Sequence, residues 1–332
     1  MAPPLAGEDV SGGEADPAQI ESASEAVTAD IIAGLGFSDE VGRLRAVLEA
    51  WIGQASGEMQ PLLRWQFQAR SKYFRPLTMF ACHRALSAEP IPDRLIRSAA
   101  VLEMIHNVTL IIDDIVDQSD ERRGKATLYC RFGLLPALMA SGYIVADAFA
   151  MSAADPHDAL LISDLLKRLG VAECRQWRLR RQPLGLDDWH EIASEDTGSM
   201  FETCACLATR DETLRKFGHL LGVLYHGCDD VGDVKGLESL GGGGEEDLRD
   251  GILTLPASLA IQDPGLAALF CAPEPSAADL ERISLALRAQ LPAAELHLDE
   301  LAGEARWEAR FHSAHPDALL ALVDHTRELS RR

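Results

Sequence analysis

Positive charge is scarce in this 332-residue chain, where 31 Lys and Arg face 52 Asp and Glu and leave a formal net charge of −21. Such an acidic surface repels phosphate backbones, which excludes a predominantly electrostatic nucleic-acid binder. The first 42 residues contain no Lys or Arg. A secretory signal or an Arg-rich transit peptide needs basic residues there, so we expect neither and predict a cytoplasmic protein.

Long apolar runs and paired cysteines are also missing. No stretch approaches about 18 uninterrupted apolar residues, so we expect no transmembrane helix. The seven cysteines are an odd number without C-x-x-C spacing, which favours reduced thiols packed as small hydrophobic groups over a metal or redox site. The length excludes a small disulfide-stapled scaffold, because a chain of this size can bury a large core.

The N-terminal segment combines acidity with few large apolar side chains. Residues 1–40 hold nine acids and no base, and Pro and Gly are frequent in the first stretch. Residues 1–15 cannot bury enough surface to offset the entropy lost on ordering, so we predict a disordered acidic tail. No long polar linker divides residues 16–332, for which we predict a single all-α domain.

The apolar pattern is helical almost throughout. Between residues 93 and 117, apolar side chains recur at three- and four-residue spacing. Similar stripes cover residues 39–56, 75–87, 136–153, 157–181, 187–209, 212–235, 277–291 and 316–330. No hairpin signal such as Asn-Gly between alternating apolar runs occurs. We therefore expect an all-α domain of about a dozen helices.

Two Asp-Asp-x-x-Asp motifs stand on these expected helices. Their members are Asp113, Asp114 and Asp117 in the first motif, and Asp229, Asp230 and Asp233 in the second. Carboxylates three or four residues apart on a helix repel one another unless something neutralises them, and the flanking residues here are largely apolar. Oxygen ligands suit Mg²⁺, which completes its shell with water and substrate phosphate. Two such helices facing each other would hold several Mg²⁺ ions and one polyphosphate.

The few basic residues lie near these motifs in the sequence. Lys72 and Arg75 are one helical turn apart, and Arg122 and Arg123 directly follow the first motif. His106 precedes Asp113 by seven residues, about 10 Å along the same helix face. Because the planar guanidinium donates two hydrogen bonds to phosphate at once, these residues are predicted to hold anions beside the metal site.

The order and spacing of these motifs over about residues 60–260 resemble those of the all-trans polyprenyl diphosphate synthases. The motifs that carry the resemblance are Lys72-x-x-Arg75-Pro76, Glu103-x-x-His106, Asp113-Asp114-x-x-Asp117, Arg122-Arg123-Gly124-Lys-Ala-Thr127 and Asp229-Asp230-x-x-Asp233. The resemblance implies an isoprenoid-synthase helical bundle around a central cavity, usually homodimeric. It implies a Mg²⁺-dependent prenyltransferase that condenses isopentenyl diphosphate with an allylic diphosphate.

The same resemblance assigns roles to individual residues. The six aspartates are expected to bind three Mg²⁺ and the allylic diphosphate, with Arg122 on the allylic side. Lys72, Arg75, His106 and Arg123 are expected to bind isopentenyl diphosphate. Thr197 and His226 complete the expected substrate-binding set.

Several positions depart from the family pattern. Family members usually have Lys where this chain has Asp196, Gln where it has His226, and Lys where it has Ile252 in a motif that otherwise keeps Asp247 and Thr254. An upstream Gly-Gly-Lys has become Arg-Ser-Lys at residues 70–72. Two cations expected beside the allylic diphosphate are therefore missing.

Three functions remain compatible with the sequence. The chain could be an elongating synthase, a cyclase or prenyltransferase with another acceptor, or a non-catalytic partner subunit. The complete isopentenyl-binding set favours elongation, since a cyclase has no use for it. Both acidic motifs would be retained without reason in a non-catalytic subunit.

Product length depends on the side chains beneath the first motif. Val108 and Thr109 stand five and four residues before Asp113, and neither is aromatic. The floor typical of fifteen-carbon synthases is thus absent at that depth, while Tyr143 on the facing helix could close the tunnel. We expect geranylgeranyl diphosphate, with twenty carbons, or a longer product.

Overall fold

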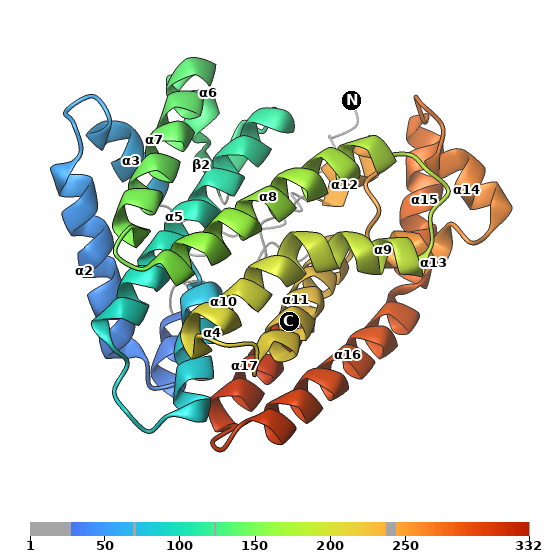
Figure 1. Cartoon of the computed structure of the whole chain (residues 1–332). Helices are drawn as coiled ribbons and strands as arrows, with labels where there is room; N and C mark the ends of the chain where they lie inside the picture. The colour runs from blue at the N-terminus through green and yellow to red at the C-terminus, as the bar shows by residue number, and fades with distance from the viewer. Residues whose placement is uncertain (1–27, 69–70, 123, 237–243, 332) are drawn as a thin grey trace, which may run out of the picture.

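A computed structural model describes residues 28–68, 71–122, 124–236 and 244–331, and nearly all of its regular structure is helical (Figure 1). The predicted all-α class is confirmed. The elements are α2 (Ser38–Gln54), α3 (Gln60–Phe67), α4 (Phe74–Leu86), α5 (Asp93–Val116), β1 (Glu121–Arg122), β2 (Lys125–Ala126), α6 (Leu128–Phe132), α7 (Leu134–Ser152), α8 (Pro156–Leu179), α9 (Leu186–Ala193), the π-helix η1 (Ser194–Gly198), α10 (Ser199–Thr209), α11 (Arg215–Lys235), α12 (Gly244–Asp250), α13 (Leu255–Ala260), α14 (Pro264–Phe270), α15 (Ala277–Ala289), α16 (Leu291–His312) and α17 (Asp317–Glu328). Residues 28–34 are also helical, and the predicted acidic tail over residues 1–15 lies outside the described residues.

The predicted helices agree with the observed ones to within a few residues, with three differences. The predicted helix over 187–209 is divided into α9, η1 and α10. The predicted helices do not include the 22-residue α16 or the shorter helices α3, α6, α12, α13 and α14. A short antiparallel pair, β1 with β2, forms where no hairpin was expected.

Helix starts follow from local side-chain chemistry. Asp155 accepts the backbone N–H of Asp158 and is followed by Pro156, whose fixed φ suits the first turn of α8. Ser276 and Asp279 form a reciprocal capping box at the start of α15. Such caps satisfy backbone donors that have no partner within the helix, so each helix begins where its cap stands.

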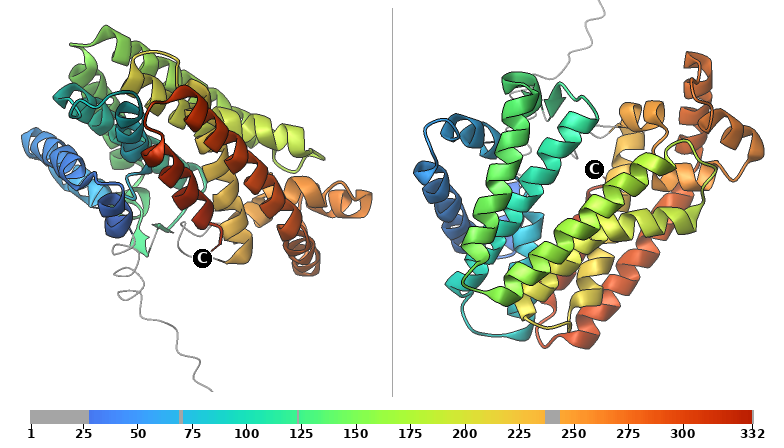
Figure 2. Two further views of the ribbon diagram at one scale, coloured as in Figure 1. Left: turned by 90° about the horizontal axis from the view of Figure 1, so that it is seen from below. Right: turned by 45° about the horizontal axis from the view of Figure 1, so that its top comes forward.

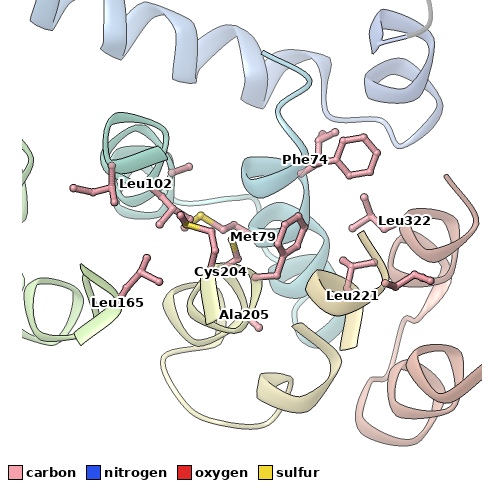
Figure 3. Close-up of a cluster of buried hydrophobic side chains, with 14 of the residues drawn as sticks. Phe74, Met79, Leu102, Leu165, Cys204, Ala205, Leu221 and Leu322 are labelled. Atoms are coloured by element: carbon pink, nitrogen blue, oxygen red, sulfur yellow. The ribbon is translucent and has the colours of Figure 1, made fainter. Parts of the chain in front are cut away.

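The hydrophobic core is built from helices far apart in the sequence. Figure 3 shows side chains of α4, α5, α8, α10, α11 and α17 meeting, among them Phe74, Met79, Leu102, Leu165 and Leu221. Helix α2 packs against α5 on one side of the bundle and α16 packs against α11 on the other (Figures 1 and 2). This packing fixes α5 and α11, which carry the two aspartate motifs.

Two glycines let α11 approach η1 and α10 closely. A side chain at Gly222 would place its Cβ 2.6 Å from the carbonyl oxygen of Thr197, and one at Gly218 would lie 2.4 Å from that of Phe201. No real Cβ tolerates such distances, so only glycine permits this contact. The contact brings residues 196 and 197 to the face of α11 that carries the second motif.

The seven cysteines are all free, and Cys82, Cys204, Cys206 and Cys228 are buried. Burial raises the pKa of the Cys82 thiol well above its usual value, as expected for an inert core thiol. Helices α5 and α7 are long and apolar enough to cross a membrane, a test that buried core helices also pass. In the apolar 18-residue stretch of each helix that meets this test, 67% is buried inside the protein for α5 and 28% for α7.

Candidate active site

The first motif lies on the last turn of α5. Asp114 is buried, and its Oδ1 accepts a hydrogen bond of 2.8 Å from Nε of Arg122 on β1. Burial and the nearby carboxylates of Glu173 and Asp196 raise the pKa of Asp113 well above its usual value. Asp114 therefore has a cation supplied by the protein, whereas Asp113 mainly faces other acids.

The second motif, on the last turns of α11, likewise has one aspartate bound by protein donors and one surrounded by other acids. Oδ2 of Asp230 accepts 2.7 Å hydrogen bonds from Nε1 of Trp189 and from the backbone N–H of Leu255. Burial and the carboxylates of Asp229 and Asp247 raise the pKa of Asp233 to about 8. Oδ1 of Asp233 is buried without a hydrogen-bond partner among the described residues. Asp230 thus anchors α9 and α13 to α11, while Asp233 points to other carboxylates.

Two further acids join the motifs. Burial raises the pKa of Glu173, on α8, to about 7, with Asp196 and Asp117 adding to the effect, although part of this residue is exposed. Burial likewise raises the pKa of Asp247, on α12, to about 7, with contributions from Asp230, Asp229 and Asp117. Asp247 therefore interacts with carboxylates of both motifs.

We call these side chains the acidic centre. Its six members are Asp113, Asp117, Glu173, Asp229, Asp233 and Asp247. Asp247 was noticed in the sequence as part of a motif but was not predicted as a site residue, and Glu173 was missed. Glu173 interacts electrostatically with Arg180, the residue that follows α8, and its spacing along the chain gave no signal for this role.

The two departures at residues 196 and 226 meet in the structure. Nδ1 of His226 lies 3.3 Å from Oδ2 of Asp196 and 3.0 Å from Oγ1 of Thr197. Burial alone would lower the pKa of His226, but the carboxylates of Asp230, Asp196 and Asp229 raise it to about 9. At neutral pH the histidine is therefore a cation that neutralises the unexpected aspartate.

The predicted anion-binding residues surround this centre. Lys72 lies near enough to Asp233 to oppose the rise in its pKa, and Arg75 similarly lowers the pKa of Asp196. The Arg75 guanidinium stands 5.7 Å from the Phe201 ring centroid, and its buried Nε has no hydrogen-bond partner among the described residues.

The other predicted binding residues are less closely defined. His106 is half-buried on α5, and its carbonyl oxygen accepts a 2.8 Å hydrogen bond from Oγ1 of Thr109. Arg123 lies outside the described residues. The structure therefore places His106 on the helix of the first motif, without assigning it a ligand.

The predicted chain-length residues lie in different surroundings. Val108 is buried and Thr109 is half-buried, both on α5 before the first motif. The hydroxyl of Tyr143 instead interacts with Asp147 and with the backbone at Ser56, in the connection between α2 and α3. A chain-length role stays a prediction for all three.

A second group of possible metal ligands lies at the start of α8. One atom from each of Asp155, His157 and Asp158 falls within 4.8 Å of the others. Arg210 is paired with Asp155, and Nη1 of Arg94 lies 3.5 Å from Oδ2 of Asp158. These carboxylates already have cations from the protein, whereas in the acidic centre Asp117 is paired with Arg180 and the other members interact mainly with further carboxylates.

The sequence was compared with known families. The polyprenyl synthetase family model matches residues 58–279, about two thirds of the chain. The chain belongs to the polyprenyl synthetase family. The enzyme is accordingly a prenyltransferase of the trans-prenyl diphosphate synthase type, and its family generally uses divalent metal.

Individual relatives differ in product. A nonaprenyl diphosphate synthase of Mycobacterium tuberculosis is 29% identical over 331 residues, covering 90% of this chain and 97% of that protein. The octaprenyl diphosphate synthase of Escherichia coli is 29% identical over 197 residues, covering 56% of this chain and 60% of that protein. A geranylgeranyl pyrophosphate synthase of Arabidopsis thaliana is also 29% identical, covering 60% and 59%.

Solved structures agree on the fold. The heptaprenyl diphosphate synthase of Staphylococcus aureus superposes with a TM-score of 0.81 at 20% identity, covering 89% of this chain and 98% of that one. A polyprenyl synthase of Caulobacter crescentus, solved with calcium and isoprenyl diphosphate, has a TM-score of 0.74 at 25% identity, covering 95% and 97%. The predicted isoprenoid-synthase fold is confirmed.

Proposed function

We propose that this enzyme condenses isopentenyl diphosphate with an allylic diphosphate in a Mg²⁺-dependent reaction. The observation that carries the proposal is the acidic centre, where carboxylates from α5, α8, α11 and α12 interact and where burial and neighbouring acids raise the pKa of Asp113, Glu173, Asp233 and Asp247. Carboxylates held together in this way favour a divalent cation, because only a cation or a proton relieves their repulsion.

The carboxylates fit three Mg²⁺ ions in chemistry, since all are hard oxygen donors. Asp113 and Asp117 would bind metal on one side, and Asp229 and Asp233 on the other. Asp114 and Asp230 would bind metal through one oxygen at most, because Arg122 engages Oδ1 of Asp114, and Trp189 and Leu255 engage Oδ2 of Asp230. Bound metal would neutralise the charge that develops on the departing diphosphate.

The protein side chains contribute positioning and exclusion of water. Arg122, Thr197 and His226 would hold the allylic diphosphate, and Lys72, Arg75, His106 and Arg123 the diphosphate of isopentenyl diphosphate. The allylic C–O bond breaks, and the double bond of isopentenyl diphosphate supplies the electron pair of the new C–C bond. A proton then leaves the adjacent carbon for the released diphosphate, which is the nearest strong base. No protein nucleophile is required.

One assay separates this function from its alternatives. The protein is incubated with Mg²⁺, isopentenyl diphosphate and allylic diphosphates of five to twenty carbons, and the extract is analysed with and without phosphatase. Longer prenyl alcohols found only after phosphatase treatment support elongation. Hydrocarbons formed from an allylic diphosphate alone would establish a cyclase. A product in which the prenyl group is joined to a different acceptor would establish another kind of prenyltransferase. Absence of turnover with intact metal binding would indicate a non-catalytic partner subunit.

The product is proposed to be geranylgeranyl diphosphate or longer. Val108 and Thr109 are small and precede Asp113 by about one helical turn, so neither blocks a long chain there. We expect Thr109→Phe to shorten the product by at least one five-carbon unit, measured by chromatography of the dephosphorylated alcohols. Thr109→Ser is the matched control, and an unchanged product in Thr109→Phe would remove this residue from the cavity wall.

We also propose that the enzyme is a homodimer that pairs through α7. Its first two turns expose Leu134, Leu135, Leu138 and Met139, a spacing that gathers them on one face. A second copy is the simplest cover for such an apolar face on a helix of this length. Light scattering after size exclusion should give twice the chain mass, and Leu135→Asp with Met139→Asp should give the monomer.

A further inference from the structure

Arg180 lies between the acidic centre and the loop that follows α12. Its Nη2 is 3.0 Å from Oδ1 of Asp117, and its Nη1 is 3.4 Å from Oδ2 of Asp250. The guanidinium carbon stands 4.4 Å from the centroid of the Trp177 ring. Nε is buried and has no hydrogen-bond partner among the described residues. Arg180 therefore keeps donor capacity that the protein does not use.

The neighbouring residue fixes this position. The backbone N–H of Arg181 donates a 2.9 Å hydrogen bond to the carbonyl of Gly251, and its guanidinium donates to the carbonyls of Ala272 and Arg249. Gly251 has φ +68°, and a Cβ there would lie 2.5 Å from Cγ of Arg181. The end of α8 is thus attached to the segment just before Ile252. Arg180 is held at this point by backbone contacts and does not depend on its ion pairs alone.

The charges around the centre show what Arg180 can do. Arg122 is committed to Asp114, and the cationic His226 is committed to Asp196. Ile252, which lines a small pocket with Asp233 and Asp247, contributes no charge. The metal-facing carboxylate Asp117, in contrast, shares its charge with an arginine that a metal ion would displace.

We propose that Arg180, the residue that follows α8, binds the diphosphate of the allylic substrate and supplies the positive charge that residues 196 and 252 do not provide. Without ligand, the guanidinium neutralises Asp117. Once Asp117 binds metal, Nη2 of Arg180 is free to donate to phosphate oxygens, and Nε already lacks a partner among the described residues. The contact with Asp250 and the stacking on Trp177 keep the guanidinium in place. This inference rests on the proposed function and identifies one of its binding residues.

A purely structural ion pair would behave differently. In the proposed role, Arg180 competes with Mg²⁺ for Asp117 but cooperates with Mg²⁺ in holding diphosphate. Removing the side chain should therefore strengthen binding of Mg²⁺ alone and weaken binding of Mg²⁺ with diphosphate. If Arg180 had only a structural role, its removal would not change these two affinities in opposite directions.

The test uses the full chain and isothermal titration calorimetry with two probes, Mg²⁺ alone and inorganic pyrophosphate in excess Mg²⁺. We expect Arg180→Gln to raise the Kd of pyrophosphate by about 10- to 100-fold, as for the loss of charge-assisted hydrogen bonds. The same variant should lower the Kd of Mg²⁺ alone. Arg180→Lys keeps the positive charge but not the planar guanidinium, so both of its Kd values should lie between those of the wild type and Arg180→Gln. Arg178→Gln, at an exposed position on another face of α8, should leave both constants unchanged.

Steady-state kinetics and a folding check complete the test. The KM of the allylic substrate should rise in Arg180→Gln while that of isopentenyl diphosphate stays constant. Circular dichroism and thermal unfolding identify a misfolded variant, in which case Arg180→Lys decides. Unchanged pyrophosphate affinity in a folded variant, or weaker Mg²⁺ binding, overturns the proposal. If the wild type binds pyrophosphate but transfers no prenyl group, the proposed function alone is wrong. If the wild type does not bind pyrophosphate, both the proposed function and the role of Arg180 are wrong.

Discussion

Carboxylates in two regions of this enzyme differ in the charges that surround them. Glu202, on α10, lies 3.0 Å from Nη1 of Arg168 and 2.6 Å from Nη2 of Arg215. Burial alone would raise its pKa, but hydrogen bonds from His219, Arg168 and Arg215 lower it to about 2. The acidic centre, whose members are half-buried apart from the exposed Glu173, has pKa values of about 7 to 8 for Glu173, Asp233 and Asp247.

The difference shows how to distinguish a structural acid from a ligand. Around Glu202 and Asp158 the fold supplies arginines from other elements, so each negative charge is neutralised by the protein itself. In the acidic centre Asp117 is paired with Arg180, but the other members interact mainly with further carboxylates, and the remaining repulsion is relieved by protons or by an external cation. The first arrangement stabilises the fold, and the second reserves its charge for a ligand.

The largest expected effect is on catalysis at the acidic centre. Asp113→Asn should reduce prenyl transfer by about 10³-fold, because losing a metal-binding carboxylate removes several kcal/mol of transition-state stabilisation. The same change removes one of several mutually repelling charges, so the metal-free variant should unfold at the wild-type temperature or above it. Radiolabelled isopentenyl diphosphate measures the first quantity and calorimetry the second.

Asp120→Asn is the control for this variant, since Asp120 is exposed just beyond the same motif. Undiminished activity in Asp113→Asn would refute the assignment of the centre as a metal site. A large drop in thermal stability would show that Asp113 is structural after all.

Glu202→Gln should show the reverse behaviour. Removing the shared partner leaves Arg168 paired with Glu195 alone and Arg215 paired with Glu212 alone, which costs about 2 kcal/mol of unfolding free energy. Mg²⁺ affinity should not change, because Glu202 is not part of the acidic centre. Urea unfolding followed by circular dichroism measures the loss, with Glu281→Gln, at an exposed position on α15, as control. Unchanged stability would contradict the contrast drawn between the two groups.

The pH dependence should follow from the raised pKa values of the centre. Groups whose folded pKa lies near 7 to 8, against about 4 when unfolded, add stability that is complete below pH ~4 and lost as the pH rises through 7 and 8. In EDTA the melting temperature should therefore fall between pH 6 and pH 8.5, by on the order of 5 °C. Glu202 and Asp155, with pKa values of about 2, act only in acid and do not contribute in this window.

Added Mg²⁺ should reverse this loss, and its stabilising effect should be larger at pH 8.5 than at pH 6, because protons no longer compete for the carboxylates. Differential scanning fluorimetry at both pH values, with and without Mg²⁺, measures the effect. A melting temperature that rises with pH in EDTA would be inconsistent with a centre of mutually repelling acids.

The smallest effect is expected at Asp155, His157 and Asp158. Since Arg210 and Arg94 already neutralise these carboxylates, His157→Ala should change Mg²⁺ affinity and activity by no more than about twofold, as at an ordinary surface position. Titration calorimetry against wild type tests this. Loss of one bound Mg²⁺ in the variant would identify a second metal site. It would also show that carboxylates paired with arginines can bind metal.

Local patterns determined much of this protein. Eight of the nine expected helices appear at nearly the expected bounds, because apolar spacing and caps act within a few turns. Both Asp-Asp-x-x-Asp motifs were recognisable because three like charges after an apolar run are unfavourable without a cation. Helix α16 escaped prediction because Leu296, Trp307 and Phe311 are exposed and obscure its apolar stripe.

Tertiary structure decided the rest, because the remaining features depend on contacts between distant segments. The π-helical turn η1 forms against Gly222 on α11, and through it Asp196 meets His226. Sequence alone left the charge at residue 196 as a defect in the family pattern. Only the fold shows that His226 neutralises it, that Glu173 and Asp247 join the aspartates, and that Arg180 reaches Asp117 from 63 residues away. Electrostatic energy depends on distance in space, and spacing along the chain reports that distance only within a helix.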